Sequence, residues 1–165
     1  MLSRKQALAA LACAGLTPLA ETNAFAASEK AVVGAWKLET FDVIEKGARK
    51  PRYCENPVGY LMYSASGRVS AVLSALHRAE LTPPPNSIAA SDLHCIESIR
   101  PFLAYAGRYR IRGNRVFHTV ETSVFTNLVG TTLEREFSIQ GDTLTIRTLP
   151  PEIWGSANIL TWRRT

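Results

Sequence analysis

The sequence predicts an all-β fold: an eight-stranded antiparallel up-and-down barrel with one helical insertion between strands 3 and 4. Three observations predict it. Short segments alternate apolar and polar residues with the period of two that strands have. Turn-forming pairs such as Gly113-Asn114 and Gly141-Asp142 separate them. Every predicted strand has an apolar face, so the sheet must close on itself or pack on another sheet, and eight strands leave room for one small ligand.

The first 26 residues are set aside from the fold because they have the features of an export signal. Arg4 and Lys5 form a short cationic head, and the uncharged stretch 7–19 that follows is too short to span a bilayer. Ala24-Phe25-Ala26 then offers the small-x-small pattern that a signal peptidase cleaves. We therefore expect a cleaved signal over residues 1–26, either an ordinary secretory signal or one of twin-arginine type.

The remaining residues, 27–165, are expected to form one β-barrel domain that is periplasmic or secreted and has no integral membrane segment. This part of the chain has two cysteines, Cys54 and Cys95. An even number of cysteines in an oxidising compartment favours a disulfide between them. Two separate buried thiols are the alternative, because sequence does not show whether the two Cβ atoms meet.

Charge and motifs exclude several classes of function. The formal net charge is +5, but the basic residues are scattered and form no block with interleaved aromatic residues, so nucleic acid is not an expected partner. The three histidines, His77, His94 and His118, lie too far apart in sequence for metal-ligand spacing. No nucleophile elbow or phosphate-binding glycine loop occurs in the sequence, and we expect neither a metal nor a cofactor.

The strands are delimited by turn residues, as at Gly67 after Ser64-Ala65-Ser66, where a tight hairpin is expected. A wider loop is expected over 149–155. The eight predicted strands cover residues 32–44, 57–63, 67–74, 104–112, 115–124, 129–139, 142–148 and 157–164.

One long insertion interrupts the strands, from about residue 77 to 102. The prolines at 83–85 cannot join a helix or a central strand, and Ser87 or Ser91 then suits a helix N-cap. Apolar residues follow at helical spacing, and Pro101 is expected to end the helix. This helix would either close one mouth of the barrel or serve as a surface brace. The residues at helical spacing are Ala89, Leu93, Ile96 and Leu103.

Arg135 is the most informative candidate for a binding residue. It lies between Leu133 and Phe137 on an otherwise apolar strand face, and a charge inside a barrel is costly unless it is paired. One interpretation is an anchor for a carboxylate or another polar group of a mainly apolar ligand. The other is an arginine that reaches solvent or pairs with a fixed acid.

His118, Tyr60 and Tyr105 are the other candidate ligand-binding residues. On a strand with period two, His118 shares the face of Val116 and Val120 and can act inside the cavity as a hydrogen-bonding group or, in an enzyme, as a general base. The alternatives are a core histidine with satisfied hydrogen bonds and tyrosines that serve only packing. Glu121 falls on the opposite face, so no simple His118–Glu121 dyad is expected without a bulge.

Several segments resemble one known family. Gly34-Ala35-Trp36 has the G-x-W pattern that opens the first strand of lipocalins. More specific are VGYLMYSASGRVSAVL at 58–73, FLAYAGRYRI at 102–111 and VFHTVETSVFTNLVGTTLEREFSIQGDTLTIRT at 116–148. Together they resemble the bacterial and fungal lipocalin-like domain family over nearly all of residues 27–165.

The resemblance implies an up-and-down barrel with a lidded or plugged interior, and it implies no established catalytic apparatus. It also implies that Trp36 lies at the closed end under an arginine of the last strand, either Arg163 or Arg164. This chain departs from the family pattern where Thr119 replaces a second histidine after His118. It departs again at Thr126 and Leu128, where a proline and a tryptophan usually flank the asparagine matched by Asn127. An activity that needs a histidine pair is therefore not expected here.

The principal hypothesis is an exported protein that binds a small apolar or amphipathic molecule in the barrel interior. An isomerase or cyclase acting on a small apolar substrate, with His118 or a tyrosine moving one proton, is the second. A structural barrel with a filled core is the third. The interior distinguishes them: a filled interior excludes the first two, a cavity that both His118 and Arg135 face retains the enzyme, and an apolar cavity without them favours plain binding.

Overall fold

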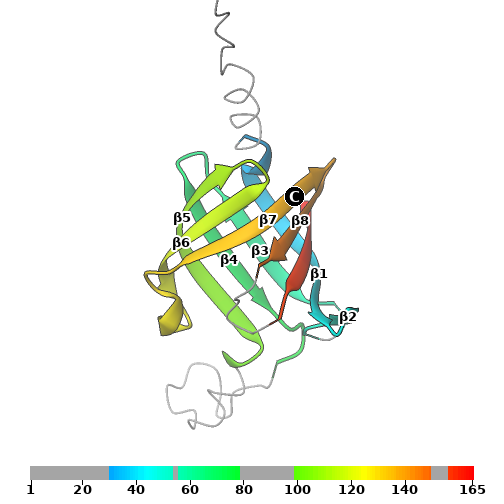
Figure 1. Ribbon diagram of the computed structural model, residues 1–165. Coiled ribbons are helices and arrows are strands. Elements are labelled where there is room, and N and C mark those ends of the chain that lie inside the picture. Colours follow the sequence, from blue (N-terminus) through cyan, green and yellow to red (C-terminus); the bar gives the residue numbers. More distant parts are fainter. Residues whose placement is uncertain (1–29, 54–55, 79–98, 150–155) are drawn as a thin grey trace, which may run out of the picture.

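The computed structural model describes residues 30–53, 56–78, 99–149 and 156–165 (Figure 1). Their regular structure is almost entirely antiparallel strand, with one short 3-10 helix, η1 (Thr126–Leu128), and helical residues at 30–32 and 99. The strands are β1 (Gly34–Glu45), β2 (Ala48–Pro51), β3 (Val58–Tyr63), β4 (Arg68–Ser74), β5 (Phe102–Arg112), β6 (Arg115–Ser123), β7 (Thr132–Gln140), β8 (Thr143–Thr148) and β9 (Asn158–Arg164).

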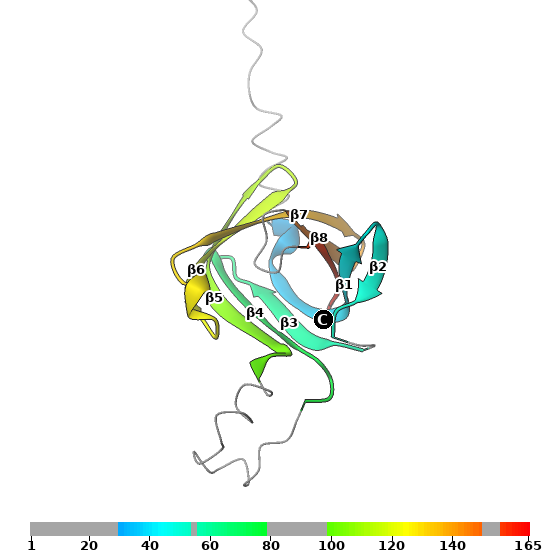
Figure 2. The same cartoon turned by 60° about the horizontal axis from the view of Figure 1, so that its bottom comes forward.

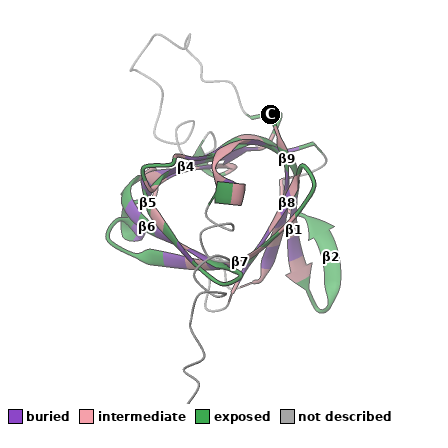
Figure 3. Ribbon diagram, turned by 90° about the horizontal axis from the view of Figure 1, so that it is seen from above, coloured by how far each residue is buried: buried purple, intermediate pink, exposed green. Residues whose placement is uncertain are grey.

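The strands form one sheet that closes into a barrel. Their order is β2-β1-β3-β4-β5-β6-β7-β8-β9, and β1 also pairs with β9, which closes the ring. Viewed along the barrel, β1 and β3 to β9 surround the interior while β2 lies outside the ring (Figures 2 and 3). The predicted eight-stranded antiparallel barrel is therefore confirmed, and all eight predicted strands correspond to barrel strands.

β2 is the strand that the sequence did not predict. It forms a hairpin with β1 through a turn at Lys46 and Gly47, both of which have positive φ (50° and 80°). All four of its residues are exposed. A strand with no buried face has no apolar alternation, so the period-two pattern could not detect it.

The structure does not support the predicted helical insertion between β4 and β5. Leu103, assigned to the face of that helix, instead lies in β5, and the N–H of Ala75 donates to the carbonyl of Pro101 (3.0 Å), which continues the β4–β5 pairing. Ile99 is helical, and the rest of the predicted helix falls on residues 79–98, outside the described residues. The export signal, Cys54 and Cys95 also lie outside them. Within the described ranges, no helix is long and apolar enough to cross a membrane.

One end of the barrel is closed by Arg164 and Trp36. The guanidinium of Arg164 lies over the Trp36 ring, with Cζ 4.0 Å from the ring centroid. It also donates to the carbonyls of Val33 (3.0 Å) and Ala31 (2.6 Å), while Trp36 Nε1 donates to the carbonyl of Val32 (2.8 Å). The arginine-over-tryptophan contact expected from the resemblance is thus present, and Arg164 provides it.

Arg164→Met is expected to destabilise the barrel more than the neighbouring Arg163→Met. The first substitution removes two charge-assisted hydrogen bonds and a cation–π contact, which together are worth about 3 kcal/mol or more. Arg163 points outward to Glu39 (2.9 Å), and an exposed ion pair contributes at most about 1 kcal/mol. Urea unfolding of the two variants measures the difference, and equal losses would contradict the closing role of Arg164.

Candidate functional site

The barrel interior contains a small cavity with a volume of about 40 Å³. Each of the eight barrel strands contributes at least one residue to its wall. Most of the wall is apolar, but five of the lining residues have polar side-chain atoms. The apolar lining residues are Phe41, Leu61, Ala71, Leu73, Leu103, Ile146 and Leu160, and the five with polar atoms are Tyr105, His118, Arg135, Thr148 and Trp162.

His118 lies at the centre of a buried hydrogen-bonded group. Its Nε2 is 2.8 Å from the hydroxyl of Tyr63, and its Nδ1 is 2.8 Å from the hydroxyl of Tyr105. The three side chains come from β6, β3 and β5, and His118 is only 1% exposed. Both ring nitrogens are therefore occupied by tyrosines that the barrel brings together from different strands.

Burial sets the protonation state of this group. Burial, with a smaller effect of the Arg135 charge, lowers the pKa of His118 from 6.5 to about 3. Burial also raises the pKa of Tyr63 well above its usual value. At neutral pH the imidazole is therefore uncharged and the Tyr63 phenol keeps its proton. An uncharged imidazole has one N–H donor and one acceptor nitrogen.

Arg135 faces the cavity from β7, as the alternation of that strand predicts. It is 7% exposed, and its strand neighbours are Val116 on β6 and Thr148 on β8. Its Nη1 donates to the carbonyl of Glu134 (3.1 Å). A buried guanidinium on the cavity wall is a group that recognises carboxylate and carbonyl oxygens.

The structure brings Tyr105, His118 and Arg135 to one cavity but places Tyr60 elsewhere. Tyr60 is 50% exposed on the outer face of β3, so the prediction that it lines the interior is wrong. The inward residues of this strand are Leu61 and Tyr63. Both faces of β3 carry apolar residues, with Met62 also outside, so the alternation alone gave no way to choose between them.

Two residues of the site were not among the predicted ones. Tyr63 follows from the register of β3 once Tyr60 is known to point outward. Trp162 lies two residues before Arg164 on β9, and it lines the cavity with its indole 2% exposed. The period-two pattern of the last strand was the available signal for Trp162.

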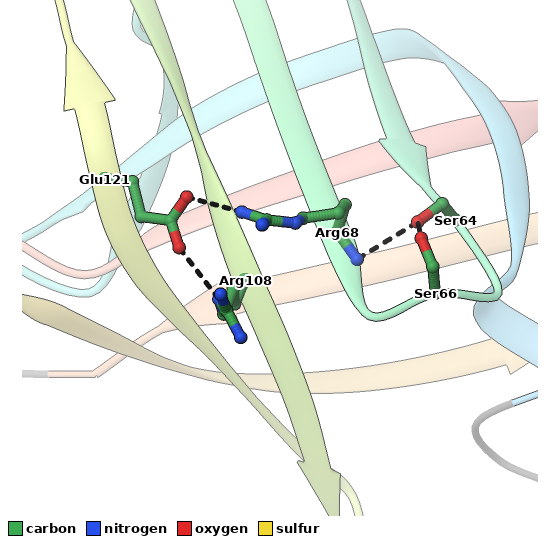
Figure 4. Close-up of polar contacts among 5 residues, drawn as sticks. All are labelled: Ser64, Ser66, Arg68, Arg108 and Glu121. Atoms are coloured by element: carbon green, nitrogen blue, oxygen red, sulfur yellow. Dashed lines mark hydrogen bonds and ion pairs between the residues drawn. The ribbon is translucent and has the colours of Figure 1, made fainter.

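Glu121 lies outside the barrel and does not reach His118. The β5–β6 register shifts between Ala106 and Gly107, and Glu121 lies exposed on the outer surface beside this bulge. There its carboxylate accepts hydrogen bonds from Arg108 (2.9 Å) and Arg68, as Figure 4 shows, and these bonds lower its pKa. The expected absence of a simple dyad therefore agrees with the geometry, although a bulge does occur.

Other features of the described residues offer less than the interior site. Among them, no group of three metal-ligating side chains lies together. A hollow of about 570 Å³ lies beside the β1–β2 hairpin, between Lys50, Tyr53 and Arg100. Four of its lining residues are charged, Glu45, Lys50, Arg52 and Arg100, and all of these but Arg52 are exposed. The buried polar group in the interior is therefore the better candidate site.

Comparisons with known proteins agree with the barrel. The family model described as "Lipocalin-like domain" matches residues 33–165. A similar protein is the 4'-hydroxy-3'-methoxypropiophenone carrier protein ppsC of Aspergillus oryzae. It is 33% identical over 88 residues, which are 47% of this chain and 79% of that protein.

Proposed function

Because the chain belongs to the lipocalin-like domain family, we propose that it binds and carries a small apolar or amphipathic molecule in the barrel interior. The observation that carries this proposal is the polar group on an otherwise apolar cavity wall. Burying Arg135 and His118 costs free energy that an apolar core would not. A binding site explains this arrangement, because a few polar groups in an apolar pocket fix the orientation of a ligand.

The similar fungal protein supports a carrier role. Its name gives its ligand as an aromatic ketone with hydroxy and methoxy substituents. A molecule of that type has a flat apolar body and oxygen atoms at its periphery. The interior of this barrel offers matching surfaces, with leucines and Phe41 for the ring and Arg135 and Tyr105 for an oxygen.

The size of the cavity sets a condition on binding. Its volume of about 40 Å³ corresponds to about three water molecules. An aromatic ligand therefore enters only if lining side chains change rotamer. Leu73 and Leu103 lie beside each other near the ends of β4 and β5, and leucine side chains at such positions can move without breaking the strand pairing.

The geometry favours binding over proton transfer by His118. A general base needs a nitrogen that can accept a proton from the substrate. Both ring nitrogens of His118 are hydrogen-bonded to tyrosine hydroxyls, and its pKa of about 3 makes it a weak base. We therefore propose that His118 orients the two tyrosines and does not transfer a proton to or from a ligand. Export to the periplasm or the medium stays a prediction, which fractionation of the source cells tests.

Arg135→Leu is expected to weaken binding of fatty or aromatic carboxylic acids by about 1.5–3 kcal/mol, the range for a charge-assisted hydrogen bond. Isothermal titration calorimetry with a panel of such acids measures the change. Arg147→Leu on the neighbouring strand β8 is the control, since Arg147 is exposed outside the barrel. If Arg135→Leu bound every acid of the panel as tightly as the wild type does, Arg135 would not be the anchor for the carboxylate.

A further inference from the structure

The hydrogen bonds of Tyr63 determine which nitrogen of His118 carries the proton. Among the described residues, the Tyr63 hydroxyl has no hydrogen-bond partner other than Nε2 of His118. If Nε2 carried the proton, the buried phenol of Tyr63 would have to leave its own O–H without an acceptor, which is unfavourable. Tyr63 therefore donates to Nε2, and the proton of the neutral imidazole lies on Nδ1.

This tautomer fixes the role of Tyr105. Nδ1–H of His118 donates to the Tyr105 oxygen, 2.8 Å away, so the proton of Tyr105 is directed to a different acceptor. Tyr105 lines the cavity, whereas Tyr63 does not. Tyr63 thus donates to His118, and His118 donates to Tyr105. Because the Tyr105 oxygen already accepts from His118, its own O–H acts as a donor at the cavity wall.

Trp162 and Thr148 add donors to the same wall. Nε1 of Trp162 is buried and has no hydrogen-bond partner among the described residues, although the residue lines the cavity. Thr148 Oγ1 already accepts from the backbone N–H (2.7 Å) and Nδ2 (3.3 Å) of Asn158, which leaves its proton for donation. A buried indole N–H without an acceptor indicates that a group inside the cavity is meant to accept from it.

We propose that the cavity wall is a set of hydrogen-bond donors that selects a ligand by an accepting oxygen, a carbonyl or a carboxylate. Its donors are Tyr105, Arg135, Thr148 and Trp162. The described residues that line the cavity include no carboxylate and no amide, so none of them suits an ammonium group. This inference rests on the proposed binding function and narrows it to a ligand class.

The first test is the tautomer of His118, which needs no ligand and no variant. Nitrogen-15 NMR of the imidazole distinguishes a protonated from an unprotonated ring nitrogen. We expect a protonated Nδ1 and an unprotonated Nε2. A protonated Nε2 would overturn the inference, because Tyr105 would then donate to His118, while the binding function itself would be unaffected.

The second test compares phenylpropionate with phenylpropylamine, which share one carbon skeleton and differ in the polar end. By calorimetry the acid should bind, and the amine should bind at least about tenfold more weakly, the factor for one lost hydrogen bond to a charged group. Equal affinities would contradict the proposal that the donors of the cavity wall select an accepting oxygen, but they would leave the binding function in place. If neither compound binds, the proposed function fails and this inference fails with it.

Two further measurements show which side chains of the cavity wall contact the bound acid. Phenylpropionate should shift the indole N–H resonance of Trp162 and leave that of Trp36 unchanged, because Trp36 donates to the carbonyl of Val32.

Tyr105→Phe should weaken acid binding about fivefold, the factor for one neutral hydrogen bond. Tyr109→Phe, on the same strand, should not, since its hydroxyl donates to the carbonyl of Ser64 (3.0 Å). Equal effects of the two tyrosine variants, or an unmoved Trp162 signal, would contradict the proposed wall.

Discussion

Acidification from above the pKa of an unperturbed histidine to below that of the buried His118 is expected to destabilise the barrel by about 5 kcal/mol through His118 alone. The buried imidazole has a pKa of about 3 in the folded protein, against 6.5 for an unperturbed histidine. Between these values the unfolded chain binds a proton that the folded protein does not, so the free energy of unfolding falls as the pH falls. Above pH 6.5 the residue is neutral in both states and contributes no pH dependence. At about 1.4 kcal/mol for each pH unit, the window of 3.5 units yields the stated loss.

The measurement is urea unfolding at several pH values, made on the wild type and on His118→Gln. Carboxylates also titrate in this range, but their contribution is common to both proteins and cancels in the difference. His77→Gln is the control, because His77 has an exposed side chain after β4 and should leave the wild-type slope intact. The same slope in wild type and His118→Gln would show that His118 is protonated in the folded barrel at acidic pH.

Gly107→Ala is expected to cost at least about 3 kcal/mol of stability, at the upper end of the range for overpacking. A Cβ atom at this position would lie 2.0 Å from the carbonyl oxygen of Thr119 and 3.0 Å from the amide nitrogen of Glu121. Both are backbone atoms of β6 at the bulge, so a side-chain rotation cannot relieve the contact. The two strands would have to separate at this point.

The control for Gly107→Ala is Gly130→Ala. Gly130 has a φ of 82° but open space around its missing Cβ, so its replacement costs only the backbone strain, about 1 kcal/mol. Urea unfolding compares the two variants. A loss at Gly107 no larger than that at Gly130 would mean that the β5–β6 bulge can adapt to a side chain.

The barrel was predictable from the sequence because strands buried on one face carry an alternating pattern. The same reasoning placed Arg135 and His118 inside, where their strands have one clearly apolar face. It failed for Tyr60, since β3 carries apolar residues on both faces, with Val58, Tyr60 and Met62 all exposed. For such a strand, pairing with β1 and β4 determines which face points into the barrel. The local sequence pattern does not predict the register of that pairing.

The hydrogen-bonded group of the site was less predictable than its members. Tyr63, Tyr105 and His118 are separated by up to 55 residues, and only closure of the barrel brings their polar atoms within 2.8 Å. Sequence alternation shows that each side chain points inward but not at what height in the barrel it lies. The choice between a lone core histidine and a histidine held by two tyrosines therefore required the structure.

The contact of Arg164 with the first strand has a consequence for how the protein folds. The hydrogen bond of Arg164 to the carbonyl of Ala31, just before β1, joins residues 133 positions apart, and the β1–β9 pairing beside it closes the ring. The ring cannot close while the last strand is still being synthesised, and until then β1 and β8 each keep an unpaired edge. Open edges are sites at which chains pair with one another. The nascent protein is thus most prone to aggregation before β9 becomes available, and contacts across so long a stretch of chain form slowly.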